Sequence, residues 1–148
     1  MAITKTEGAT RAGDGKYLFD MNALGRVEAG KGYATTNGPL VEGNRIQVGL
    51  MTMPRGTGAR AHSHPNEQWV YIIKGHGRVS VDGQPETIAG PGSLIYIPAN
   101  TIHYTVATAD EDLHFFTCKD MSHGIVGMAA DGTMSGPHFD PGFEPGRK

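Results

Sequence analysis

Residues 62–83 read HSHPNEQWVYIIKGHGRVSVDG, and this stretch decides the fold. Its middle, residues 68–74, is rich in aromatic and β-branched side chains, which favour a β-strand. A glycine-rich turn follows at residues 75–77, and residues 78–83 predict a second short strand that ends in an Asp-Gly hairpin turn. Short strands joined by tight turns predict an all-β sandwich or barrel.

The same pattern continues on both sides of this stretch. Further strands are predicted at residues 45–53, 86–88, 93–97, 103–107 and 113–119. The chain has 22 Gly and 9 Pro in 148 residues, which describes many turns and disfavours helices. We therefore predict one domain, residues 1–148, with a barrel at approximately 41–120, an N-terminal arm at 1–40 and an irregular C-terminal tail at 121–148.

Composition limits the cellular compartment and the classes of partner that we expect for this protein. The formal net charge is −2, which gives no basis for a nucleic-acid or membrane partner. Cys118 is the only cysteine, so no internal disulfide can form, as is typical of a reducing compartment. Residues 1–17 lack the apolar core of a signal peptide, and no apolar run approaches the roughly 20 residues of a membrane span. We expect a cytoplasmic protein.

Histidines in and after the opening stretch indicate a metal site. His62 and His64 are two positions apart, so on a strand their imidazoles lie on one face. His103 comes from a distant predicted strand, and converging imidazole nitrogens suit a divalent transition metal. Period 2 also places Arg60 on this face, where it could hold a substrate carboxylate, although such an arginine more often reaches solvent.

Two segments resemble the motifs of the cupin superfamily. Residues 58–75, GARAHSHPNEQWVYIIKG, resemble the first motif, which has Gly, His-x-His, an acidic residue and Gly in this order. Residues 92–103, GSLIYIPANTIH, resemble the second, with Gly, Pro and a final His. The resemblance to small single-domain cupins (cupin 2 type) implies a double-stranded β-helix, or jelly-roll barrel. It also implies a metal inside one mouth of the barrel, and commonly a homodimer.

One position departs from the family pattern. The usual acidic ligand follows the second His at a spacing that here gives Gln68, while Glu67 falls one short and turns to the opposite face. We expect His62, His64, His103 and the amide oxygen of Gln68 to hold the metal. The alternatives are a Gln68 that only lines the pocket and a Glu67 that orients a ligand histidine. A neutral amide leaves the metal at +2, which favours an anionic chelating substrate.

The last predicted strand leaves one question open. His114, Phe116 and Cys118 share one of its faces, and Leu113, Phe115 and Thr117 share the other. One set lines the barrel, and the sequence does not say which. If His114 faces inward, it is a candidate catalytic acid or base.

The leading functional hypothesis is a metal-dependent enzyme that acts on a small organic substrate. We favour a non-haem Fe(II) dioxygenase that cleaves a carbon–carbon bond of a chelating substrate, with Val70, Ile72 and Ile97 as water-excluding walls. The first alternative is a lyase or isomerase that uses Ni, Mn or Zn as a Lewis acid, and Cu also suits these donors. The second alternative is a metal-containing module that binds a small molecule without turnover.

Overall fold

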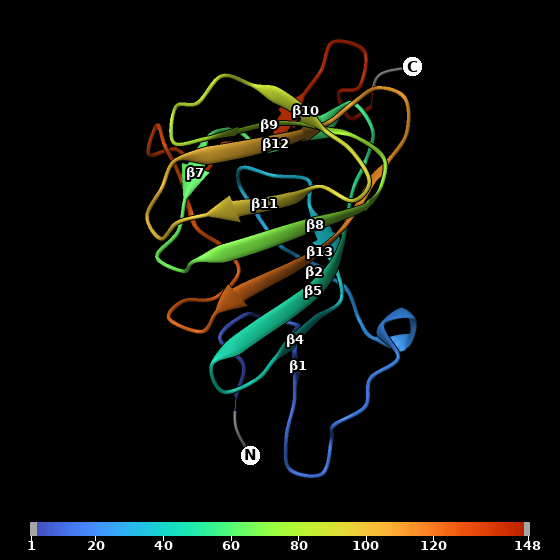
Figure 1. The fold of residues 1–148 in the computed structure, drawn as a ribbon, viewed down its shortest axis with the longest axis vertical. Coiled ribbons are helices and arrows are strands. Elements are labelled where there is room, and N and C mark those ends of the chain that lie inside the picture. The colour runs from blue at the N-terminus through green and yellow to red at the C-terminus, as the bar shows by residue number, and fades with distance from the viewer. Residues whose placement is uncertain (1–2, 147–148) are drawn as a thin grey trace.

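The structure, a computed structural model, describes residues 3–146 and is all-β, as the sequence predicts. Its regular elements in this range are fifteen short strands and one 3₁₀ helix, η1 (Met21–Ala23). The strands form two sheets that face each other as a jelly-roll barrel, with β9, β10 and β12 on one side and β5, β8 and β13 on the other (Figure 1). Within residues 3–146, no helix has the length and apolar character needed to cross a membrane.

The first sheet carries the long strands. Its order is β1 (Thr10–Arg11), β4 (Leu40–Glu42), β5 (Ile46–Met53), β13 (Leu113–Asp120), β8 (Gln68–Lys74) and β11 (Leu94–Ile97). Two short strands of the arm, β2 (Val27–Glu28) and β3 (Asn37–Gly38), pair with each other, and β3 also pairs with β5. The arm therefore extends this sheet and is part of the barrel wall.

The second sheet contains His62 and His103, two of the three histidines predicted to bind the metal. Its order is β10 (Thr87–Ala89), β9 (Gly77–Val81), β12 (His103–Ala107), β6 (Thr57–Gly58) and β15 (His138–Phe139). A further strand, β7 (His62–Ser63), pairs with β12 and with β14 (Met128–Ala129). The tail was expected to be irregular, yet two of its segments are strands of this sheet.

Strict alternation of buried and exposed side chains sets what faces the interior. On β8, Gln68, Val70 and Ile72 are buried, whereas the residues between them are exposed. On β13, the buried set is Leu113, Phe115, Thr117 and Lys119. This answers the question that the sequence left open, because the face with Leu113 lines the barrel and the face with His114 lies outside.

The arm and the tail are joined by a buried carboxylate and a hydroxyl. The carboxylate of Glu42 is fully buried and accepts the backbone N–H groups of Lys5, at 2.7 Å, and of Thr6, at 2.9 Å. The hydroxyl of Thr6 accepts the N–H of Ile125 at 2.8 Å. Since a buried polar group is stable only when it is hydrogen-bonded, these contacts hold the beginning of the arm and the beginning of the tail against the barrel.

Large apolar side chains cover the outer face of the first sheet. Each is at least 40% exposed, and the set is Ile46, Trp69, Tyr71, Ile73, Leu94, Tyr96 and Phe116. They come from four adjacent strands, and the rings of Trp69 and Tyr96 pack at 4.6 Å between centroids. A continuous apolar patch of this kind marks an interaction surface.

We expect this face to form the interface of the predicted homodimer. Replacing Tyr71 and Phe116 by lysine puts two charges at its centre, so sedimentation velocity should show a dimeric wild type and a monomeric double variant. The matched control is Ile88→Lys, because Ile88 is 63% exposed on β10 of the other sheet. A monomeric wild type, or an Ile88→Lys variant that dissociates equally, contradicts the prediction.

Candidate metal centre

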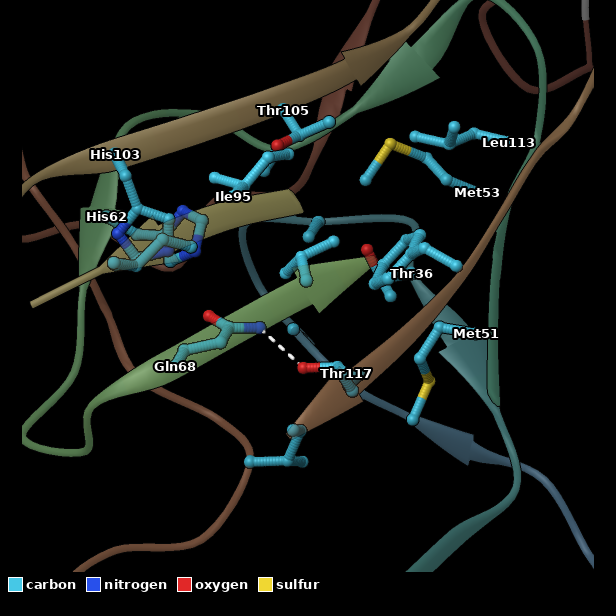
Figure 2. A pocket seen from close by; sticks show the side chains of 18 of the residues that line it. Thr36, Met51, Met53, His62, Gln68, Ile95, His103, Thr105, Leu113 and Thr117 are labelled. Carbon is cyan, nitrogen blue, oxygen red and sulfur yellow. Dashed lines mark hydrogen bonds between the residues drawn. The ribbon is translucent and has the colours of Figure 1, made fainter. Parts of the chain in front are cut away.

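Three buried histidines meet at one end of the barrel. His62 lies on β7 and His103 directly opposite it on β12, while His64 follows β7 where Pro65 ends the extended chain. The ring centroids of His62 and His103 are 4.2 Å apart, and those of His64 and His103 are 4.9 Å apart. One nitrogen of each ring lies within 4.8 Å of the others, so the cluster could hold a metal ion. Figure 2 shows two of these rings, His62 and His103, close together at the wall of the cavity.

A backbone carbonyl sets the tautomer of each imidazole. The Nδ1–H groups donate to the carbonyl of Arg60 from His62, of Asn66 from His64 and of Thr101 from His103, at 2.8, 2.9 and 2.9 Å. Each acceptor is only two residues away along the chain, so the ring orientation is built into the local backbone. The lone pair of each imidazole is therefore on Nε2, as in histidines that ligate metals.

Burial keeps these imidazoles neutral. Desolvation lowers the pKa of His62 to about 2, with the positive charge of His103 as a second cause. Burial likewise lowers the pKa of His64 to about 3 and that of His103 to about 4. Near neutral pH, all three lone pairs are available to a metal without the loss of a proton.

His64 lies between two hydrogen-bond acceptors. Its Nδ1 is 2.9 Å from the carbonyl of Asn66, and its Nε2 is 3.0 Å from Oε1 of Gln68. A neutral imidazole has one N–H, and the lowered pKa of His64 opposes the doubly protonated form that could donate to both. A cation between Nε2 and Oε1 removes this conflict by accepting both lone pairs, so the donor set fits a metal.

Gln68 is placed for this role by the neighbouring strand. It projects inward from β8, and its Nε2 donates to the hydroxyl of Thr117 on β13 at 2.8 Å (Figure 2). Glu67 points outward and is exposed, and its carboxylate accepts the hydroxyl of Tyr96. The structure therefore brings Gln68, and not Glu67, to the histidines.

Two other candidates lie away from the cluster. Arg60 donates to the carbonyls of Gly32, Thr133 and Gly136 and pairs with Asp131 at 2.8 Å, so its guanidinium fastens the tail to the arm. His114 is on the outer face of β13, where its Nδ1 is 3.1 Å from the hydroxyl of Thr52. The sequence left both positions open, and the contacts of Arg60 with the tail and the orientation of β13 place these two side chains away from the histidines.

Two residues of the site, Tyr33 and Lys119, were not predicted, because neither lies in a motif that indicates a metal or substrate site. The Tyr33 ring stacks on the ring of His62, with 4.1 Å between their centroids. The Tyr33 hydroxyl accepts the N–H of Gly127 at 2.8 Å. Lys119 is 4% exposed, its Nζ donates to the carbonyl of Ile125 at 3.0 Å, and burial lowers its pKa to about 7. Alternation from Thr117 would have placed Lys119 inside, but lysine near a strand end normally reaches solvent.

The interior of the barrel is a small cavity. Its volume is about 60 Å³, and Val70, Ile72 and Ile97 line it as expected. The polar lining includes His62, His103, Gln68, Thr117 and Lys119. A water needs roughly 10–15 Å³ by this measure, so the cavity has room for a ligand of a few heavy atoms.

The depressed histidine pKa values predict an acid-labile metal-free protein. The folded state holds the three imidazoles neutral down to pH 4 or below, whereas the unfolded chain protonates them near 6.5. Stability is therefore complete above pH 6.5 and falls as the pH drops, with a limiting slope of about 4 kcal/mol per pH unit for three protons. Urea unfolding between pH 7.5 and 4.5 measures this slope.

The variant His103→Gln should reduce the limiting slope by about one proton. The matched control is His76→Asn, which changes an exposed histidine in the turn before β9. Equal slopes for the wild type and His103→Gln would show that the cluster is protonated in the folded protein.

Known proteins match both the sequence and the fold. The profile of the cupin domain family matches residues 49–118. Over 53 residues, the chain is 34% identical to an acireductone dioxygenase of Bacillus licheniformis, a segment that covers 33% of this chain and 30% of that protein. The chain thus matches less than a third of the length of that relative.

Solved structures extend the comparison to the fold. KdgF from a Halomonas species superposes with a TM-score of 0.60 at 19% identity, over 70% of this chain and 94% of that one. The DMSP lyase DddQ from Ruegeria pomeroyi gives 0.56 at 22% identity, over 64% of this chain and 47% of that one. At such identities the likeness shows a common fold. The matched segment, the two-sheet barrel and the histidine cluster thus make this chain similar to the cupin domain family, and the solved structures show that it shares their fold.

Proposed function

We propose that this protein is a metal-dependent enzyme that acts on a small oxygenated substrate. Its metal ligands are His62, His64, His103 and the amide oxygen of Gln68. The observation that carries the proposal is the conflict at His64, whose two nitrogens both face acceptors. A divalent metal bound there would polarise the oxygens of a chelating substrate and, as Fe(II), would supply dioxygen chemistry.

The residues around the ligands orient, shield and charge the site. The carbonyls of Arg60, Asn66 and Thr101 hold the imidazoles, and the hydroxyl of Thr117 holds the amide of Gln68. The apolar walls keep bulk water from the substrate. Since every ligand is neutral, the centre keeps the full charge of its metal and attracts an anionic substrate.

Within this class, we favour an Fe(II) dioxygenase that cleaves a carbon–carbon bond of a substrate with adjacent oxygens. The matched segment of the acireductone dioxygenase supports this choice, as does a cavity that admits only a small chelating molecule. The alternative is a lyase or isomerase that uses Ni, Mn or Zn. The absence of a carboxylate from the described metal-binding cluster favours it, because an all-neutral ligand set makes the metal a stronger Lewis acid.

Elemental analysis and oxygen uptake test these proposals together. Protein purified without added metal should hold one divalent ion per chain, and Fe(II)-loaded protein should consume dioxygen with small diketones or 2-oxo acids. Oxygen-independent turnover that persists with Zn(II) would favour the lyase or isomerase. Metal binding without turnover of any substrate in the panel would indicate a binding module, and a wild type that binds no metal would refute the metal centre.

Substitutions at the cluster give a direct prediction for metal affinity. The variant His103→Gln should bind the metal more weakly than the wild type, by more than the roughly 10–100-fold that removal of an outer hydrogen-bond partner costs in metal affinity. The matched control is His114→Gln, because His114 lies outside the barrel, and it should bind metal as the wild type does. Equilibrium dialysis with Zn(II) measures both.

Gln68→Glu tests whether the amide is a ligand. A carboxylate lowers the net charge of the centre from +2 to +1, so this variant should bind the metal more tightly and anionic ligands more weakly. A Gln68 that only lines the cavity, with its amide nitrogen turned toward His64, would instead leave the metal affinity unchanged.

A further inference from the structure

Lys119 is a buried cation in the wall of the candidate active site. It lies on β13 in register with Gln68 of β8 on one side and Gln47 of β5 on the other. Its side chain lines the same cavity as His62, His103 and Gln68. Its charge lowers the pKa of all three histidines, with burial as the larger cause, so the amine acts on the whole cluster.

No carboxylate among residues 3–146 forms an ion pair with this amine. Lys119 donates to the carbonyl of Ile125 at 3.0 Å, and the charge of Asp120 raises its pKa by less than burial lowers it. The adjacent carboxylate of Asp120 accepts the N–H groups of Glu67 and Ser122. The buried carboxylate of Glu42 is used by the backbone of Lys5 and Thr6.

A buried charge without a partner is costly, and a single carbonyl does not offset its desolvation. The neighbours of Lys119 in register are neutral amides, and burial lowers its pKa to about 7, so an anion in the cavity would keep the amine protonated. The cavity, at about 60 Å³, admits a few heavy atoms beside the histidines. One small molecule in this cavity can therefore present an anionic oxygen to Lys119 and another oxygen to the histidine cluster.

We infer that Lys119 is the anchor for an anionic group of the substrate, and that the substrate is a small carboxylate with a second oxygen on the adjacent carbon. The ammonium would pair with one carboxylate oxygen while the remaining oxygens face the metal position that the Nε2 atoms of His62, His64 and His103 surround. This inference rests on the proposed metal centre and names the substrate class and the residue that selects it.

Oxalate, a dianion with adjacent oxygens, is the probe for this role. Calorimetric titration of Zn(II)-loaded protein should show that Lys119→Gln, which keeps a hydrogen-bond donor but no charge, weakens oxalate binding by about tenfold or more. Lys119→Met should do the same. The control Lys74→Met removes an exposed lysine at the far end of β8 and should bind oxalate within about twofold of the wild type.

The thermal stability of the metal-free variants separates an anchor from a purely structural lysine. Lys119→Met should melt at the same temperature as the wild type or higher, because methionine fills a similar volume without an uncompensated charge. A structural lysine would instead give a lower melting temperature and unchanged oxalate affinity, which overturns the inference.

Metal analysis before each titration keeps the outcomes distinct. A wild type that binds Zn(II) but not oxalate, or variants at Lys119 that bind oxalate as well as the wild type, overturn the role of Lys119 and leave the metal centre standing. A wild type that takes up no Zn(II) overturns the metal centre and this inference with it.

Discussion

The site depends on one constraint, which is that a neutral imidazole carries a single N–H. In each of the three histidines, the Nδ1–H donates a hydrogen bond to a carbonyl two residues away. The lone pair is therefore on Nε2, the opposite nitrogen, which faces the interior. The fold adds a second constraint, because the pairing of β7 with β12 places His62 directly opposite His103. The barrel therefore brings the three Nε2 lone pairs together at one point.

Convergence of lone pairs also fixes the electrostatics of the interior. The cluster has neutral imidazoles and a neutral amide, and the buried amine of Lys119 lines the same cavity. A metal would add positive charge to a cavity that already contains a basic group and no paired carboxylate. An anion inside would offset this charge, which is how the cavity would select a small acidic molecule.

Periodicity predicted those parts of the site that local sequence controls. Two-residue spacing placed His62 with His64, and Gln68 with Val70 and Ile72, and these predictions of a shared face are confirmed. It could not orient β13, because both faces of that strand carry large apolar side chains. The inward position of Lys119 followed from that orientation, so the one buried cation of the site was missed.

The remaining environment of the site comes from contacts between segments far apart in the chain. The tail strand β14 pairs with β7, Gly127 donates to the Tyr33 hydroxyl, and Ile125 holds the amine of Lys119. Turn-rich sequence predicts irregular chain, and only tertiary packing shows that this chain lies over the histidines. The motif therefore supplies the histidines, while the arm supplies Tyr33 against His62 and the tail supplies the carbonyl of Ile125 that accepts a hydrogen bond from Lys119.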